Sequence, residues 1–587
     1  MKKIFNNLFL LWKFFKNDRK KQFGYFIGLT TLSSLMEVIS IGAIFPFLII
    51  LSASSITEGG KIIELISNIL SINDVAELRL ALTILFCSAI LIAGALRVYL
   101  LRISTKLCFS AGADISCAIY GNAIHMPYEA QVKKNSSLVI SGISTKSHIV
   151  INLVLWPCLN IISNIFLLVF IMALLLSINW ILVVSIFGVF TLLYLSLFKL
   201  SRKSLLKSSE IGAKEATNSI KLLQEGLGAS RDILMGETQE IFYSMYKDSE
   251  LKLRSAQGLN IFINSSPRYV IEAIGIFCLV SMAYFFSLDS NGIDSAIPMI
   301  GVLALASQRL LPIIQQLYGG ITSIVGNKYV LDDILILLDG SEIPGKQNED
   351  HDIELPFTNH ILFQDLSYKY DLDAPWIFRN INLKIQKGSI VGVVGESGAG
   401  KSTLIDLLMT LLNPTEGIIK VDDVEIDDGN KKCWRKNIAH VSQSTFLLDA
   451  SIKQNIAFGI PESLIDMELV IKCAEKVRMS ELIESWTEGY ESKVGERGAL
   501  LSGGQVQRIG IARALYKRAM VLVLDEATSA LDDATEDVIL DVLDGMRNEF
   551  TIVLVSHRLS TLKICDRVIK LISPSNVLEC KYIHNER

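Results

Sequence analysis

The most constraining feature of the chain is a stretch of 50 residues, 149–198, without a single Asp, Glu, Lys or Arg. A helix needs about 20 mostly apolar residues to cross the roughly 30 Å hydrocarbon core of a bilayer. The stretch is therefore long enough for two crossings, and we place the turn between them near Asn179 and Trp180. Half of the 587 residues are apolar, 20% are charged and the mean hydropathy is +0.42, so part of this chain is expected to lie in lipid.

Other apolar runs of similar length bring the number of predicted spans to six. Glu37, Arg97, Glu272 and Arg309 are the charged residues that fall inside these other runs. The predicted spans cover approximately residues 23–52, 80–101, 149–177, 180–199, 269–288 and 296–325. We expect an all-α transmembrane domain over residues 1–336, a polar linker with Pro and Gly over 337–357, and a soluble domain over 358–587.

The loop charges predict the orientation of the spans, because cytoplasmic flanks collect Lys and Arg. The segment before the first span is basic, and so are those between spans two and three and between spans four and five. This predicts a multi-pass protein of the inner (cytoplasmic) membrane whose N-terminus and soluble domain are cytoplasmic. The whole chain has 56 basic and 60 acidic residues, a balance that favours no nucleic-acid partner.

The soluble part contains a phosphate-binding loop between an apolar strand and an apolar helix, which predicts an α/β P-loop NTPase domain. The predicted nucleotide-binding residues of this loop are Gly395, Glu396, Ser397, Gly398, Ala399, Gly400, Lys401, Ser402 and Thr403. Glycines let the backbone N–H groups face the phosphates at a helix N-terminus. We expect Lys401 to reach the β- and γ-phosphates of ATP and the Ser402 hydroxyl to ligate Mg²⁺.

A second apolar strand ends in two carboxylates, Asp525 and Glu526. Alone, such an ending is as often a strand cap as a catalytic pair. Beside a phosphate-binding loop it predicts that Asp525 joins the Mg²⁺ shell and that Glu526 polarises the attacking water.

Between these motifs the chain reads Leu501-Ser502-Gly503-Gly504-Gln505, and here it resembles the ATP-binding cassette (ABC) transporter family. The resemblance implies that this pentapeptide contacts the nucleotide of the opposing subunit, so that the protein works as a homodimer with ATP and Mg²⁺. It also implies that Tyr370 stacks on adenine, that Gln443 ligates the metal, that Asp532 lies in the D-loop and that His557 contacts the γ-phosphate. Six spans ahead of one cassette resemble an exporter half-transporter, with the type IV fold and a domain-swapped dimer.

The charges at membrane depth bear on the cargo, because each costs about 2.5–3.5 kcal/mol by insertion scales. One interpretation is that Glu37 and Glu272 pair with arginines inside the protein. The other is a basic cavity lining that meets an anionic head group such as a diphosphate.

Local resemblances in spans one, five and six favour the second interpretation. Residues 36–47, 267–272 and 308–312 resemble bacterial flippases for lipid-linked oligosaccharides, and Arg97, Arg268 and Arg309 match cavity arginines of that group. The sequence departs from the pattern at Gln316, where a further arginine is expected. The leading hypothesis is an ATP-driven flippase for an anionic polyprenyl-diphosphate saccharide. The alternatives are export of another lipid, a drug or a peptide, and an ATP-gated regulator or channel.

Overall fold

The computed structural model describes residues 2–42, 74–287, 310–339, 355–371, 373–527, 533–547, 549–573 and 576–580. The chain divides into two compact units. The first comprises Met1–Met126 and Gln131–Gly345, and the second comprises Pro127–Ala130 and Lys346–Arg587. Most of the predicted linker, and the first half of the predicted sixth span, lie outside the described residues.

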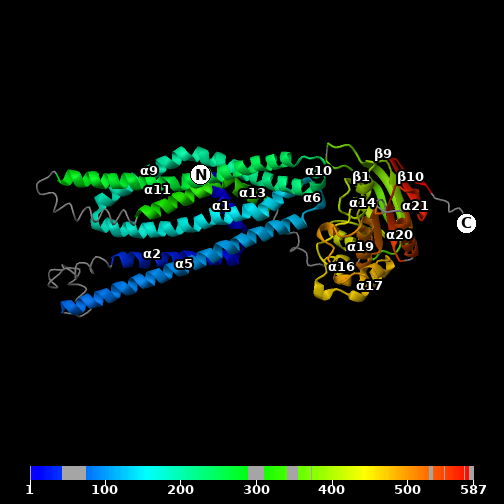
Figure 1. Ribbon diagram of the computed structural model, residues 1–587, viewed down its shortest axis with the longest axis horizontal. Coiled ribbons are helices and arrows are strands. Elements are labelled where there is room, and N and C mark those ends of the chain that lie inside the picture. The colour runs from blue at the N-terminus through cyan, green and yellow to red at the C-terminus, as the bar shows by residue number, and fades with distance from the viewer. Residues whose placement is uncertain are drawn as a thin grey trace. The chain divides into compact units, whose positions relative to one another are not determined.

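The described part of the first unit is helical throughout (Figure 1). Its helices are α1 (Lys2–Phe14), α2 (Asn17–Gly42), α5 (Val75–His125), α6 (Tyr128–Lys133, shared with the second unit), α7 (Ser136–Ser141), η2 (Gly142–Lys146), α8 (Ser147–Val150), η3 (Ile151–Leu155), α9 (Trp156–Gly228), α10 (Ser230–Met235), α11 (Gln239–Ser287), Leu310–Gly326 and α13 (Lys328–Leu338). Helices α2 and α5 run side by side.

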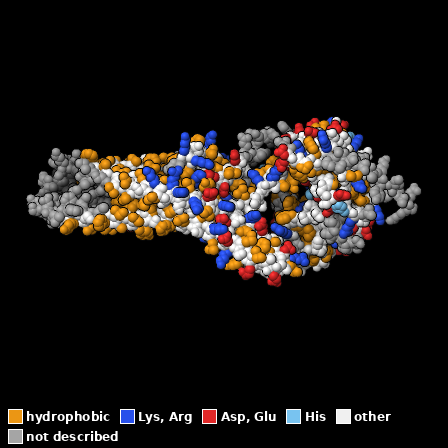
Figure 2. All heavy atoms as spheres, turned by 90° about the horizontal axis from the view of Figure 1, so that it is seen from above, with side chains coloured by type: hydrophobic (Ala, Val, Ile, Leu, Met, Phe, Trp, Pro, Cys, Tyr) orange, Lys and Arg blue, Asp and Glu red, His pale blue; other side chains and the backbone are white. Residues whose placement is uncertain are grey.

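Three helical segments of the described residues are long and apolar enough to cross a membrane: Asn17–Ser40, Ala76–His125 and Ser136–Leu176. They overlap the first three predicted spans, of which residues 43–52 of the first lie outside the described residues, and Leu310–Gly326 is a shorter apolar helix in the predicted sixth. Large apolar side chains on these helices are exposed, for example Leu91 at 72% and Val98 at 69%. Figure 2 shows the first unit covered over part of its length by hydrophobic spheres with few charges. Such a surface is suited to lipid rather than water.

Helix α9 reverses its direction, as expected for two spans. Asn164 Nδ2 donates a hydrogen bond to Gln316 Oε1 at 3.0 Å, and the rings of Tyr194 and Tyr318 lie 5.2 Å apart. In a straight helix residues 164 and 194 would be about 45 Å apart, too far for both to contact neighbouring positions of one short helix. The chain therefore folds back between them, the interval that holds the predicted turn at Asn179 and Trp180.

A buried ion pair ties η2 to α13 in the first unit. The Lys146 ammonium contacts the Asp333 carboxylate, and the Lys146 side chain is only 1% exposed whereas that of Asp333 is 30% exposed. The surrounding core is apolar and includes Val150, Ile334 and Leu337. A charge in such a site needs its partner.

The second unit contains two sheets whose strands and helices alternate along the chain. Its elements are β1 (His360–Tyr368), β2 (Phe378–Gln386), β3 (Ile390–Gly395), α14 (Lys401–Leu408), β4 (Glu416–Val421), β5 (Val424–Glu425), α15 (Lys431–Lys436), β6 (Ile438–Val441), α16 (Ile452–Ile456), η4 (Glu462–Leu464), α17 (Met467–Lys476), α18 (Ser480–Glu484), η5 (Gly489–Glu491), η6 (Glu496–Gly498), α19 (Gly503–Tyr516), β7 (Val521–Asp525), α20 (Asp533–Gly545), β8 (Thr551–Val555), α21 (Leu559–Leu562), β9 (Arg567–Ser573) and β10 (Asn576–Cys580).

The larger sheet has the order β10-β9-β3-β8-β7-β6, and its pairs β9–β3, β3–β8, β8–β7 and β7–β6 are parallel. The smaller sheet, β2-β1-β4-β5, is antiparallel. One core lies between the two sheets and includes Phe363, Val393 and Trp434, and a second core packs α16, α17 and α19 against the larger sheet. The predicted fold class, a helical membrane domain fused to an α/β P-loop domain, is confirmed.

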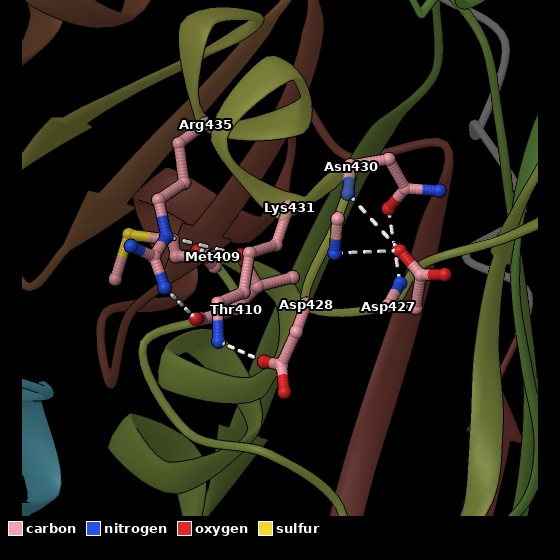
Figure 3. A network of polar contacts seen from close by, with 8 residues as sticks. Met409, Thr410, Asp427, Asp428, Asn430, Lys431 and Arg435 are labelled. Carbon is pink, nitrogen blue, oxygen red and sulfur yellow. Dashed lines mark hydrogen bonds and ion pairs between the residues drawn. The ribbon is translucent and has the colours of Figure 1, made fainter. Parts of the chain in front are cut away.

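The C-terminal end of α14 is fixed by side chains from α15. Trp434, fully buried, donates from Nε1 to the Leu408 carbonyl at 2.9 Å, and Arg435 donates to the carbonyl and hydroxyl oxygens of Thr410. Figure 3 shows the Arg435 side chain reaching Thr410 and the Asp427 carboxylate accepting from the backbone N–H of Asn430. Asp427 Oδ1 also accepts from the backbone N–H of Gly429 at 2.9 Å. Donors at a helix C-terminus satisfy its last carbonyls, so α14 is held at the end opposite its phosphate-binding loop.

The pair between Lys146 and Asp333 predicts an asymmetry in stability. Asp333→Ala leaves a buried ammonium without its partner and should destabilise the protein by about 3–5 kcal/mol. The double variant Lys146→Met, Asp333→Leu removes both charges, so its free energy of unfolding should be much closer to that of the parent protein. Thermal unfolding of the full chain in detergent measures both, and a double variant as unstable as Asp333→Ala would contradict the prediction.

Candidate nucleotide-binding site

The candidate site lies where four parallel strands of the larger sheet end. The phosphate-binding loop follows β3, Gln443 follows β6, Glu526 follows β7 and His557 follows β8. Parallel strands place their carboxyl ends at the same edge, the usual ligand-binding edge of an open α/β sheet. Residues that are far apart in the sequence are therefore brought together by the register of this sheet.

The phosphate-binding loop adopts a backbone that requires glycine. Gly400 has φ of +93°, and a Cβ atom there would lie 2.8 Å from side-chain atoms of Ile377 and Phe378. The ammonium of Lys401, a residue that is 8% exposed, donates to the carbonyls of Gly395 at 2.9 Å and Glu396 at 3.2 Å. The loop thus curls around a lysine amine at the N-terminus of α14, an arrangement that suits a polyphosphate.

Glu526 is held between the other two predicted catalytic side chains. Gln443 Nε2 donates to Glu526 Oε2 at 3.0 Å, and His557 Nε2 lies 3.4 Å from Glu526 Oε1. The backbone N–H of Glu526 donates to the Val555 carbonyl at 3.1 Å, and the φ of Glu526, +50°, lies in the left-handed region. A non-glycine residue held in that region is typical of functional sites.

The carboxylates beside this group suit a divalent cation. Burial and the negative charge of Glu526 raise the pKa of Asp525, because both destabilise its ionised carboxylate. A divalent cation bound there would offset this destabilisation. Because the Gln443 amide nitrogen donates to Glu526, its carbonyl oxygen is the atom that can ligate metal. The Gln443 carbonyl, the Asp525 carboxylate and the Ser402 hydroxyl all offer hard oxygen atoms, the type of ligand that Mg²⁺ takes together with phosphates.

The sequence reasoning missed two acidic residues near the site. Burial and the nearby Asp525 raise the pKa of Asp406 on α14 to about 6. Glu536 on α20 is 2% exposed and accepts hydrogen bonds from Arg558 and Thr561, both at 2.7 Å, which fixes the segment after His557. Asp406 lies one helical turn after Ser402, a spacing that could have indicated it, whereas nothing local in the sequence indicated Glu536.

The pentapeptide 501–505 begins helix α19. Ser502 is its N-cap: its hydroxyl accepts from the Gln505 N–H at 3.3 Å, and the Gln505 side chain accepts from the Ser502 N–H at 2.8 Å. This capping box presents the N-terminus of a 14-residue helix, where the helix dipole favours an anion. The predicted D-loop residue Asp532 lies outside the described residues.

Tyr370, the predicted adenine-stacking residue, lies beside the loop helix. It is 47% exposed, its hydroxyl is 3.0 Å from Thr403 Oγ1, and its ring stands edge-on to Tyr368 at 5.2 Å. Residues Pro127–Ala130 belong to this same unit, and there the Tyr368 hydroxyl lies 3.5 Å from Glu129 Oε1. A segment from between two predicted spans thus reaches the strand that leads to Tyr370.

In the first unit, the two predicted substrate arginines that the structure describes have carboxylate partners. Arg97 on α5 contacts Glu37 on α2, and Arg268 Nε lies 2.9 Å from Glu272 Oε1 one turn along α11. The third predicted arginine, Arg309, lies outside the described residues. Internal pairing, one of the two interpretations of these charges, is therefore present at both described sites.

Residues 378–529 match the sequence model of the family described as ABC transporter. Among curated proteins, the chain is 36% identical over 330 residues to the ATP-dependent lipid A-core flippase of Shewanella denitrificans, covering 56% of this chain and 53% of that protein. It is 38% identical over 291 residues to the leukotoxin translocation ATP-binding protein LktB of a Pasteurella haemolytica-like species, covering 49% and 40%. The chain thus spans about half the length, or less, of these two relatives.

Among solved structures, a bacterial Atm1-family ABC exporter with ATP bound has a similar fold. The TM-score is 0.74 at 20% sequence identity, and the match covers 97% of this chain and 96% of that chain. At this identity the likeness concerns the fold alone. Residues 378–529 therefore form an ABC transporter ATP-binding domain, and the chain as a whole has the fold of an ABC exporter.

Proposed function

We propose that the protein is an ATP-driven exporter of the inner membrane that flips an anionic, polyprenyl-diphosphate-linked saccharide outward. The observation that carries the ATP-driven part is Glu526, held between Gln443 and His557 at the strand edge that also bears the phosphate-binding loop. The membrane part is supported by the long apolar helices of the first unit. Relatives named as a flippase and as a translocation protein are consistent with export.

The site geometry suggests how hydrolysis proceeds. Glu526 accepts the proton of a water aligned with the γ-phosphate, and the hydrogen bond from Gln443 orients its carboxylate. Lys401 and the loop N–H groups stabilise negative charge on the phosphates as it develops. The distance of 3.4 Å between His557 Nε2 and Glu526 Oε1 supports the proposal that His557 contacts the γ-phosphate beside the attacking water. Mg²⁺ held by Ser402, Gln443 and Asp525 would supply further positive charge.

We infer that a second copy of the chain completes each site. The helix N-terminus capped by Ser502 presents backbone donors, with Gly503, Gly504 and Gln505 in its first turn. In the family that this chain resembles, such an end meets the nucleotide of the opposing subunit. The segment Pro127–Ala130, which contacts Tyr368 through Glu129, is suited to carry closure of the cassettes to the spans.

The substrate assignment rests on the resemblance in spans one, five and six and on the arginines. Arg97 and Arg268 would exchange part of their interaction with Glu37 and Glu272 for the diphosphate, and Arg309 would be the third contact. Carboxylate and diphosphate oxygens offer arginine similar bidentate geometry, so the exchange is chemically reasonable.

Replacing the base tests the ATP site. Glu526→Gln keeps the hydrogen-bonding shape but removes the proton acceptor, so steady-state ATP hydrolysis should fall by at least 100-fold while ATP still binds. Hydrolysis is measured by phosphate release and binding with a fluorescent ATP analogue. Glu549→Gln removes an exposed carboxylate elsewhere in the same domain and should leave hydrolysis unchanged. Undiminished hydrolysis in Glu526→Gln would refute its role as the base.

Removing membrane arginines tests the substrate. Arg97→Ala combined with Arg309→Ala should raise the concentration of lipid-linked saccharide for half-maximal ATPase stimulation about 10-fold while basal hydrolysis changes less than twofold, because both residues belong to the first compact unit and the ATP site lies in the second. Arg102→Ala, five residues further along α5 and outside the described cavities, is the matched control. Equal loss of basal and stimulated hydrolysis would instead indicate misfolding and would not support substrate binding by these arginines.

A further inference from the structure

Two cavities in the first unit share lining residues. The first, of about 500 Å³, lies among η3, α9, α11 and the helix Leu310–Gly326. The second, of about 470 Å³, lies among α2, α5, α9 and the same short helix. Asn160 and Gln316 line both cavities. Each volume is within the range of about 300–1,000 Å³ found for small-molecule sites.

The described lining is rich in side-chain amides and poor in net charge. Its charged side chains, among the described residues, are Glu37, Arg97 and Arg268. Both arginines already contact a carboxylate. The amides are Asn152, Asn160, Asn164, Asn264, Gln315 and Gln316. Polar groups at membrane depth are costly and usually serve function, so this concentration of amides needs an explanation.

Some of these polar groups are held in place and others are available to a ligand. Asn164 donates to Gln316 at 3.0 Å, and Thr322 donates to Asn264 at 3.2 Å, so three of the amides are held in place by hydrogen bonds. Within the described part of the chain, the Asn160 and Ser163 side chains make no hydrogen bond. Their donors and acceptors therefore face the cavity with nothing in the described protein to satisfy them.

An amide offers both a donor and an acceptor, whereas guanidinium only donates and carboxylate only accepts. A saccharide hydroxyl also donates and accepts, so an amide-lined wall matches a sugar better than it matches a phosphate. The residue at 316 is decisive here. A glutamine in place of the arginine expected at this position supplies hydrogen bonds without charge.

Resting on the proposed function, we propose that these two neighbouring cavities select the uncharged saccharide part of the substrate, with Gln316, which lines both, at the centre and Asn160 and Asn164 beside it. The diphosphate, met by the arginines, is carried but does not by itself trigger transport. The class of ligand recognised is a hydroxyl-rich head group of one or more sugar rings.

The test compares three lipids in nanodiscs containing the full chain and measures stimulation of ATP hydrolysis. The lipids are a polyprenyl-diphosphate oligosaccharide, the same polyprenyl diphosphate without sugar, and an uncharged diglycosyl diacylglycerol. We expect both sugar-bearing lipids to stimulate and the sugar-free diphosphate to stimulate less than a tenth as strongly. A sugar-free diphosphate as active as the saccharide lipid would overturn the inference and leave the proposed exporter standing. Hydrolysis that depends on Glu526 but responds to none of the three would contradict the proposed substrate itself.

Two variants of Gln316 test whether this residue determines the lipid preference. Gln316→Leu leaves sugar hydroxyls unpaired and should raise the saccharide lipid concentration for half-maximal stimulation about 10-fold. Gln316→Arg should instead create a response to the sugar-free diphosphate, which a misfolded protein could not show. Gln257→Leu makes the same chemical change on α11 outside both cavities and should behave as the parent. Unchanged lipid preference in both Gln316 variants would overturn the assignment.

Discussion

The parallel pairing of β3, β8, β7 and β6 is the constraint on which the ATP site depends. β3, β7 and β8 are nearly all apolar and buried, β6 is apolar apart from His440, and the polar residues of the candidate site stand at or just after the carboxyl ends of the strands. Pairing in register then brings four ends to one edge and places Glu526 within hydrogen-bonding distance of Gln443. A shift of one strand would remove one member of this group from the others, so the candidate site requires the apolar sheet core as well as its polar side chains.

Helix α14 holds the phosphate-binding loop in position at this edge of the sheet. Its N-terminus begins at Gly400, where a side chain would collide with Ile377 and Phe378, and its C-terminus is capped by Trp434 and Arg435. A helix of 8 residues fixed at both ends has little freedom to tilt. The amine of Lys401 and the hydroxyl of Ser402 are therefore held by a support that is already ordered, which would reduce the entropy lost on binding a nucleotide.

The sequence predicted the secondary structure around the candidate ATP site because its motifs are local. The strand–loop–helix at 390–408 lies where the residue pattern placed it, and Asp525 and Glu526 stand at the end of β7 and directly after it. The sequence analysis did not identify Asp406, because its raised pKa depends on burial and on proximity to Asp525, over 100 residues away in the chain. The membrane charges were left open between pairing and substrate binding, since the contact of Arg97 with Glu37 depends on how α2 packs against α5. Packing of long apolar helices has no sequence signal as specific as a phosphate-binding loop.

The amide lining suits a transporter better than a basic lining would. A site of unpaired arginines would hold a diphosphate through strong, charge-assisted hydrogen bonds, and such a ligand leaves slowly. Neutral hydrogen bonds contribute only about 0.5–1.5 kcal/mol each, because sugar hydroxyls exchange water for amides on entry and amides for water on exit. Selectivity nevertheless remains high, since a head group without hydroxyls leaves the amide of Asn160, which makes no hydrogen bond within the described residues, unsatisfied. A cavity of this kind combines discrimination with release, the two properties that net movement of a cargo requires.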